Sequence, residues 1–332
     1  MPSSGFPPAN PDGTWFGERM TTFPQRTPFP STDVVVVTDA GLETWLSFDR
    51  GIDLPAFAAY PLAETAAGRA ALDEYYRHYL GIASTLGTAV VLDAPTWRAN
   101  PDWAETLGHD RARLRELIHA SVDAVHRLRI DWSGEQPFLV GGAVGPRGDG
   151  YELDATMDAA TAASYHAFQI DAFADTPIDV VTAMTLGYAE EAIGVTRAAQ
   201  QAGLPVVVSF TVETDGTLPS GMALADAIDA TDQASGGYPT HYMVNCAHPT
   251  HFAHVFAEDA PWVSRVRGLR ANASSLSHAE LDEALELDRG DPQDLAGRYL
   301  ELRALLPSFH VVGGCCGTDH HHVEAIARAI CA

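Results

Sequence analysis

Cysteine residues are the clearest sign of chemistry in this sequence, because two of them stand side by side. Cys315 and Cys316 lie between glycines in the stretch GGCCGT, and Cys246 lies upstream in the stretch NCAHP. Glycines on both sides permit the tight backbone that would let two neighbouring sulfurs face one ion. We expect the fourth cysteine, Cys331, to lie at the end of the last helix and to take no part.

Four interpretations of these cysteines are open. A disulfide between adjacent residues would close a strained ring, and a reducing cytoplasm would open it. A cysteine nucleophile needs a base beside one thiol and leaves the second thiol without a task. Buried cysteines without a chemical role are common in globular proteins. Three thiolates that converge on one point would make a soft, tetrahedral zinc site with one position open for substrate.

Three consecutive histidines, His320, His321 and His322, follow the paired cysteines. We interpret them as the first turn of the last helix, with Thr318 or Asp319 as its N-cap. Because the helix would carry these side chains away from the sulfurs, we expect two of them to face solvent. A histidine as an extra zinc ligand is the lesser alternative.

The elements that must position these residues follow a (β/α)8 pattern. Short, continuously apolar runs alternate with longer alanine-rich segments, as in parallel sheets whose strands are buried on both faces. Eight such units in about 300 residues favour a closed barrel over an open sheet, and no dinucleotide-binding glycine motif follows the first run. The expected strands are Val34–Thr38, Thr88–Asp93, Pro137–Ala143, Ile178–Met184, Pro205–Phe210, His241–Cys246, Val266–Ala273 and Phe309–Gly314.

Helix signals agree with this pattern, and polar motifs follow the strands. Glu190–Gly203 ends in a glycine just before a proline, and Ser277–Leu287 begins with a capping box. In (β/α)8 barrels the active site lies at the C-terminal ends of the strands. We therefore expect one rim to carry the motifs that follow the strands, namely Asp39, Asp93–Trp103, Gly141–Tyr151, Asn245–Pro249, Asn272–Ser274 and Gly313–Thr318.

The chain divides into an arm and one domain. Residues 1–33 contain seven prolines and little periodicity, so we expect an irregular N-terminal arm that is disordered or draped over the domain. Residues 34–332 form the single barrel domain.

Composition and charge exclude several classes of partner. The 332 residues carry a formal net charge of −24, from 44 acidic and 20 basic side chains. Such a surface repels phosphate backbones and anionic lipids, so we expect no nucleic-acid or membrane partner. The chain shows neither an apolar run of membrane-spanning length nor the features of a secretory signal. Only four cysteines in this length argue against a disulfide framework, and we expect a cytoplasmic protein.

Taken together, the motifs resemble those of the zinc-dependent homocysteine S-methyltransferase family, which includes the betaine-homocysteine methyltransferases and the homocysteine domain of methionine synthase. The resemblance rests on VTDAGLETWL, PTWRANP, GGAVGPRGDGY, VNCAHP and GGCCGT, which span about Val34–Ile330. The combination of NC with a downstream GGCCGT on a barrel pattern is specific. The resemblance implies a (β/α)8 barrel in which three cysteines hold zinc.

Carried over residue by residue, the resemblance implies that Cys246, Cys315 and Cys316 bind Zn²⁺. Asn272 is similar to an asparagine whose side-chain oxygen fills the fourth zinc position before substrate arrives. Asp39 looks like the carboxylate that helps to hold the substrate's amino group. The same motifs imply that the substrate pocket also includes Ala40, Gly41, Thr96 and Asn245.

The implied reaction moves a methyl group from a sulfonium or quaternary ammonium donor to a thiol, with homocysteine giving methionine. A free thiol has a pKa of about 8.5 and is a poor nucleophile at neutral pH. Binding to zinc deprotonates the thiol, and three cysteine thiolates keep it reactive. The partners are then a small-molecule thiol acceptor and a methyl donor, whereas the donor's identity and the oligomeric state stay undetermined.

Three positions depart from the family pattern. The usual DGG start reads Asp39-Ala40-Gly41, and a following glycine position carries Glu43. Many members have a glutamate after the fourth strand, where this chain has Met184. An apolar side chain cannot pair with an ammonium group. We hypothesise that Glu43 replaces the missing carboxylate, the alternative being that Glu43 serves the start of the first helix.

Two further interpretations stay open beside homocysteine methylation. The first keeps the zinc and the thiol but changes the acceptor or donor, as in specialised sulfur or methyl metabolism, and Met184 favours it. The second is a non-catalytic zinc or redox-sensing barrel, because adjacent thiols could release metal on oxidation. The full set of motifs at the rim speaks against a mere sensor. Trp97 and Tyr151 are among the aromatic residues that could cage a methylated cation there.

Overall fold

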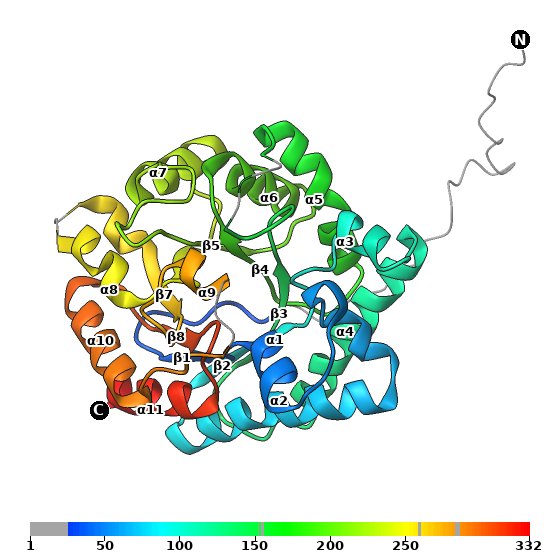
Figure 1. Ribbon diagram of the computed structural model, residues 1–332, viewed down its shortest axis with the longest axis horizontal. Coiled ribbons are helices and arrows are strands. Elements are labelled where there is room, and N and C mark those ends of the chain that lie inside the picture. The colour runs from blue at the N-terminus through cyan, green and yellow to red at the C-terminus, as the bar shows by residue number, and fades with distance from the viewer. Residues whose placement is uncertain (1–25, 152, 154–155, 258–259, 283–285) are drawn as a thin grey trace, which may run out of the picture.

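Eight parallel strands form a closed barrel in the computed structural model (Figure 1), which describes residues 26–151, 153, 156–257, 260–282 and 286–332. The strands are hydrogen-bonded in chain order, and β8 pairs with β1 to close the sheet. The expected (β/α)8 architecture is confirmed. The strands are β1 Val36–Thr38, β2 Ala89–Ala94, β3 Phe138–Val144, β4 Val180–Leu186, β5 Val206–Phe210, β6 His241–Asn245, β7 Val266–Ala271 and β8 Val311–Gly314.

Helices surround the barrel as an outer ring (Figure 1). None of the described helices is both long and apolar enough to cross a membrane. The helices are α1 Leu42–Thr44, α2 Ala66–Leu86, α3 Pro101–Thr106, α4 Arg111–Ile130, α5 Ala159–Ala174, α6 Ala189–Gln201, α7 Leu224–Ser235, α8 Pro249–Phe252, α9 His278–Asp282, α10 Pro292–Leu305 and α11 His320–Cys331. Short 3-10 or π segments cover Trp45–Asp49, Pro55–Phe57, Tyr60–Glu64, Ala253–Ala257 and Pro261–Arg265.

The sequence predicted which helices and strands form more accurately than it predicted the residues at which they begin and end. Strand β4 begins after the expected Ile178 and continues past Met184 to Leu186. The capping box before α9 is formed, because the Ser277 N–H donates to Glu280 Oε2 at 2.9 Å and the Glu280 N–H to Ser277 Oγ at 3.3 Å. The helix expected there is described only as His278–Asp282, and residues 283–285 lie outside the described residues.

Apolar side chains fill the interior of the barrel toward its N-terminal end. These side chains come from strands all around the barrel, so they pack against one another rather than leave a pore. The cluster consists of Val36, Ala89, Val91, Leu139, Val180, Val207, Met243 and Val311. The interior can therefore hold a ligand only above this layer, toward the C-terminal ends of the strands.

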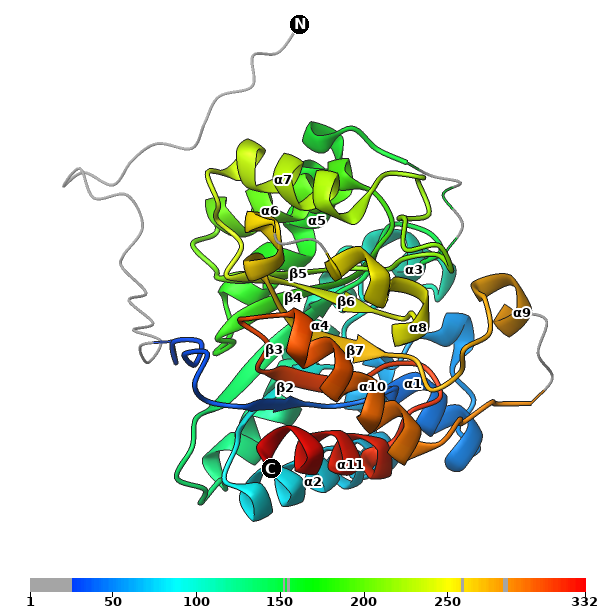
Figure 2. The same ribbon diagram turned by 90° about the vertical axis from the view of Figure 1, so that its left-hand side faces the viewer.

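Residues 26–33 lie across the N-terminal end of the barrel, opposite α9 (Figure 2). Phe29 packs against the apolar cluster and meets the His241 ring edge-on, with centroids 4.7 Å apart. The Thr27 N–H donates to Asp179 Oδ1 at 2.7 Å, and the other Asp179 oxygen accepts the Val140 N–H at 2.9 Å. The segment thus covers the end of the barrel at which the strands begin. The remainder of the expected arm, residues 1–25, lies outside the described residues.

Removing the Phe29 ring should destabilise the barrel. We expect Phe29→Ala to lower the free energy of unfolding by about 2 kcal/mol, because a half-buried ring loses its contacts and uncovers the cluster. Urea denaturation measures this change as a lower midpoint with an unchanged slope. The matched control is Ile130→Ala, at a side chain that is 70% exposed, which should change stability by less than about 0.5 kcal/mol. Equal effects of the two substitutions would contradict the role of Phe29.

Candidate active site

A cavity of about 400 Å³ opens at the C-terminal ends of the strands. Its wall receives side chains from both halves of the barrel, which is the arrangement of (β/α)8 enzyme sites. Ten of the residues expected at the site line it: Asp39, Ala40, Gly41, Glu43, Met184, Asn245, Cys246, Asn272, Cys315 and Cys316. Thr96 does not. It is fully buried, and its hydroxyl donates to the Ala143 carbonyl at 2.8 Å, which ties the loop after β2 to β3.

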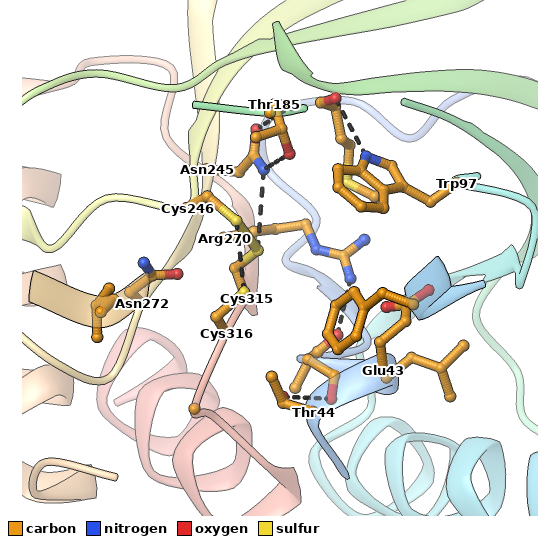
Figure 3. A pocket seen from close by; sticks show the side chains of 18 of the residues that line it. Glu43, Thr44, Trp97, Thr185, Asn245, Cys246, Arg270, Asn272, Cys315 and Cys316 are labelled. Atoms are coloured by element: carbon orange, nitrogen blue, oxygen red, sulfur yellow. Dashed lines mark hydrogen bonds between the residues drawn. A yellow bond between two sulfur atoms is a disulfide. The ribbon is translucent and has the colours of Figure 1, made fainter. Parts of the chain in front are cut away.

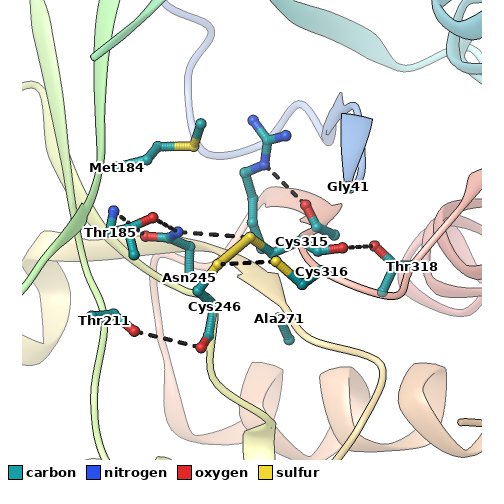
Figure 4. The surroundings of a disulfide bond; sticks show 12 residues. Gly41, Met184, Thr185, Thr211, Asn245, Cys246, Ala271, Cys315, Cys316 and Thr318 are labelled. Carbon is teal, nitrogen blue, oxygen red and sulfur yellow. Dashed lines mark hydrogen bonds between the residues drawn. A yellow bond between two sulfur atoms is a disulfide. The ribbon is translucent and has the colours of Figure 1, made fainter. Parts of the chain in front are cut away.

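The three cysteines expected to act together do meet in this cavity (Figures 3 and 4). Cys246 follows β6, and Cys315 and Cys316 follow β8. Their three sulfurs lie within 4.8 Å of one another. Cys246 and Cys315 are joined as a disulfide, and the Cys316 sulfur lies 3.8 Å from that of Cys246. A pairing across two strands was not among the interpretations weighed from sequence, which considered only adjacent cysteines.

Asn245 holds the backbone that presents Cys246. Both Thr185 and Cys246 have left-handed backbone conformations, with φ of 65° and 54°, which cost energy for residues other than glycine. The Asn245 amide oxygen accepts the Thr185 N–H at 2.9 Å and the Ser209 hydroxyl at 2.7 Å, while its amide nitrogen donates to the Thr185 hydroxyl at 2.8 Å. These bonds fix β4, β5 and β6 together at the level of the Cys246 sulfur.

Asn272 provides a buried oxygen beside the sulfurs. Only 2% of the residue is exposed, and within the described part of the chain its side-chain oxygen has no hydrogen-bond partner. In Figure 3 this oxygen is turned toward the cysteines. An unpaired buried oxygen is costly, so its presence points to a partner that binds there. Three sulfurs and one oxygen are a donor set that suits tetrahedral zinc once the cysteines are reduced.

A buried arginine, Arg270 on β7, forms the floor of the cavity. Its guanidinium donates to Asp39 Oδ1 at 2.5 Å and to Asp93 Oδ2 at 2.8 Å. It also donates to the carbonyl of Gly314 at 3.1 Å and to that of Ala40 at 3.3 Å. One cation therefore neutralises two buried acids and binds the backbone at the ends of the adjacent strands β1 and β8. Two arginines in this strand run, Arg267 and Arg270, were the sequence signal for a buried cation, and it was overlooked.

The ion pair with Arg270 changes the expected task of Asp39. Burial raises the pKa of Asp39 to about 7, because neighbouring Asp93 adds to desolvation and Arg270 only partly offsets both. One of its oxygens is already occupied by Arg270. The resemblance implied that Asp39 binds a substrate ammonium group, whereas the geometry makes it first a partner of Arg270.

Glu43 and Met184 form parts of the same wall. Glu43 is half-buried in α1, and desolvation raises the pKa of its carboxyl group. Met184 is also half-buried, and its carbonyl accepts the Trp97 indole N–H at 3.4 Å. Close packing at the loop after β1 explains the glycine there: a Cβ on Gly41 would lie 2.6 Å from the Cys315 carbonyl oxygen.

The three histidines belong to the closing helix α11. Its N-cap is Asp319, while the Thr318 hydroxyl donates to the Cys315 carbonyl at 2.6 Å. Of the histidines, only His321 is exposed. His320 is half-buried and stacks on His78 with centroids 4.0 Å apart, and His322 is buried. The expectation of two solvent-facing histidines was therefore wrong, because α2 packs against the start of α11.

His278 is a second residue that sequence reasoning missed. It is the first residue of α9, and its Nε2 lies 2.8 Å from the Cys246 carbonyl oxygen. Its ring stacks on Tyr151 with centroids 3.9 Å apart. The loops after β3 and β7 thus meet over Cys246, which a linear sequence pattern does not indicate.

Replacing Arg270 should lower the stability of the protein to an extent that depends on pH. We expect Arg270→Met to lower the free energy of unfolding by about 3–5 kcal/mol near neutral pH, because Asp39 and Asp93 lose their cation. Their pKa values are raised in the folded state, so protonation favours folding: the loss should shrink toward pH 5 and grow as pH rises through about 7. Denaturant unfolding of both proteins at pH 5 and pH 8 measures this. Equal losses at the two pH values would contradict it.

Comparisons with known proteins agree with this geometry. Residues 36–330 match the sequence profile of the homocysteine S-methyltransferase family. The sequence has no significant match among curated proteins. The fold is similar to that of the homocysteine methyltransferase MmuM from Escherichia coli. The oxidized form aligns with a TM-score of 0.69 at 20% identity, and the metallated form with 0.67 at 18%; each alignment covers 89% of this chain and 96% of that one. The chain belongs to the homocysteine S-methyltransferase family and is a methyltransferase.

Proposed function

We propose that this protein is a zinc-dependent S-methyltransferase whose acceptor is homocysteine and whose product is methionine. The observation that carries the proposal is the meeting of Cys246, Cys315 and Cys316 beside the unpaired oxygen of Asn272. Bound to reduced cysteines there, zinc would supply a positive charge that lowers the pKa of the acceptor's thiol. A site that needs three reduced cysteines suits a reducing compartment, and we place the protein in the cytoplasm.

The chain's own residues would position the acceptor. The hydrogen bonds of Asn245 fix the position of Cys246, and Arg270 fixes the loops after the adjacent strands β1 and β8. These contacts hold the three sulfurs and the acceptor's thiol in one place, which lowers the entropic cost of the transfer.

The acceptor's ammonium group needs a carboxylate, and Glu43 supplies it. Met184 stands where the family pattern has an acid, and Asp39 is already engaged by Arg270. Glu43 lines the same cavity and has no ion-pair partner within the described residues. Pairing with an ammonium group would stabilise the ionised form of this partly desolvated carboxyl group.

The donor would enter from the mouth of the cavity. Acidic side chains line this mouth, including Asp149, Glu286 and Asp288. A negative mouth attracts a positively charged donor, and the half-buried Trp97, which lines the cavity, offers an aromatic ring to a methylated cation. A sulfonium or quaternary ammonium compound has the required charge and carries an activated methyl group.

Metal and activity measurements test this function directly. Reduced protein should contain about one equivalent of zinc, and Cys316→Ser should lose most of it. The reduced, zinc-loaded protein should convert homocysteine to methionine with at least one of S-methylmethionine, S-adenosylmethionine and betaine. Chelation should abolish the conversion and added zinc should restore it. Zinc-loaded protein that methylates no thiol with any of these donors would refute the proposal.

Substitution of Glu43 tests how the acceptor is held. We expect Glu43→Gln to raise KM for homocysteine about 10-fold or more with a smaller change in kcat, because one charged hydrogen bond to the ammonium group is lost. Glu74→Gln, on the outer surface of α2, is the matched control and should leave both constants unchanged. An unchanged KM in the Glu43 variant would show that the ammonium group binds elsewhere.

A non-catalytic redox role is the second candidate, and the disulfide between Cys246 and Cys315 favours it. Such a protein would bind zinc when reduced and release it when these cysteines pair. It would show reversible zinc release on oxidation and no methyl transfer at any stage. The same zinc and activity measurements therefore separate the two functions.

A further inference from the structure

Arg98, which follows β2 in the stretch PTWRANP, lines the cavity with only 13% of its side chain exposed. Its guanidinium carbon lies 4.1 Å from the ring centroid of Trp103 and 5.1 Å from that of Trp97. These stacking contacts fix the plane of the guanidinium group without using its hydrogen-bond donors. The donors remain available to a ligand in the plane.

The charge of Arg98 is poorly compensated by its surroundings. Its carboxylate partner, Asp149, is 47% exposed, and the two charged groups lie 3.8 Å apart, beyond the 2.7–2.9 Å of a charge-assisted hydrogen bond. The Nε atom of Arg98 is buried and has no hydrogen-bond partner in the described part of the chain. Burial lowers the pKa of Arg98. A desolvated cation of this kind gains most from a bound anion.

Arg270, the other arginine of the described cavity lining, is not available for that task. Its guanidinium already contacts two carboxylates and two carbonyl oxygens. Arg98 is thus the cation that can meet a ligand. Three acids, Asp39, Asp93 and Glu43, lie around Arg270 and outweigh its single positive charge. An anionic substrate group would therefore bind at Arg98 rather than at Arg270.

Glu43 and Arg98 face the same cavity without pairing to each other in the described structure. Desolvation raises the pKa of Glu43, and the positive charge of Arg98 partly opposes this rise. A negative Glu43 and a positive Arg98 that line one cavity match a ligand that carries both a positive and a negative group close together. An α-amino-acid head group has this structure, with its ammonium and carboxylate groups attached to one carbon.

We propose that Arg98 binds the carboxylate of an α-amino-acid substrate while Glu43 binds its ammonium group. The proposal rests on the proposed methyl transfer and adds a residue that determines specificity. An amino-acid head group could belong to the thiol acceptor or to a sulfonium donor. The geometry indicates that an amino-acid head group binds here. The kinetic constants for each substrate show whether that head group belongs to the acceptor or to the donor.

The test uses the full-length, zinc-loaded protein with Arg98→Gln and Arg98→Lys. The substrates are homocysteine and 3-mercaptopropylamine, which is homocysteine without its carboxylate, each with S-methylmethionine as donor. We expect Arg98→Gln to raise KM for homocysteine about 10- to 100-fold and to leave KM for 3-mercaptopropylamine unchanged. Arg98→Lys should be intermediate, because lysine keeps the charge but loses the planar fork. A rise confined to the KM of S-methylmethionine would place the donor's head group at Arg98.

The control is Arg50→Gln. Arg50 also stacks on a tryptophan, 4.6 Å from the Trp45 ring centroid, but it lies outside the cavity lining, so both KM values should stay unchanged. If Arg98→Gln weakens the reactions of both thiols equally, or changes no KM, Arg98 does not recognise a carboxylate and the inference is overturned.

Failure of the proposed function is separable from failure of this inference. If the wild type methylates neither thiol, calorimetric binding of methionine and of 3-(methylthio)propylamine replaces the kinetic test. Binding of methionine alone, lost in Arg98→Gln, would support the carboxylate site without any methyl transfer. Equal binding of both compounds, or of neither, would overturn it.

Discussion

The buried cluster of Arg270, Asp39 and Asp93 is the interaction on which the upper half of the barrel depends. Three charges lie in an environment that disfavours each of them singly, and only their mutual contacts make the arrangement tolerable. The same guanidinium also binds the carbonyl oxygens of Ala40 and Gly314. These residues immediately precede Gly41 and Cys315, so one side chain sets the positions of the loops after β1 and β8.

A second constraint acts on the neighbouring strand, because Asn245 of β6 is the register partner of Arg270 of β7. The left-handed residues Thr185 and Cys246 would relax to other conformations if Asn245 did not hold β4, β5 and β6 together. Strain of this kind commonly marks sites where a side chain must point in one direction. Arg270 holds the loops after β1 and β8 while Asn245 holds β4, β5 and β6, and together they bring the cysteines after β6 and β8 close to one another.

The sequence was sufficient to predict the barrel and the meeting of the cysteines. Continuous apolar runs indicate parallel strands, and the end of a strand in such a barrel is always at the same rim, so Cys246 and Cys315 had to come close. The partners of Arg270 could not be predicted, because periodicity gives the face of a strand but not the residue across the barrel. The burial of His322 and the contacts of Phe29 likewise depend on how separate elements pack.

The closure of the N-terminal end has a consequence for the order of events in the site. In the described part of the chain, Phe29 and the apolar layer above it close one end of the barrel, and the cavity opens at the C-terminal ends of the strands. In the methyl transfer proposed above, the acceptor binds at the cysteines inside this cavity and the donor binds nearer the mouth, so the acceptor must arrive first. Its product must also leave last. A barrel closed at one end would therefore impose an order of binding on the two proposed substrates.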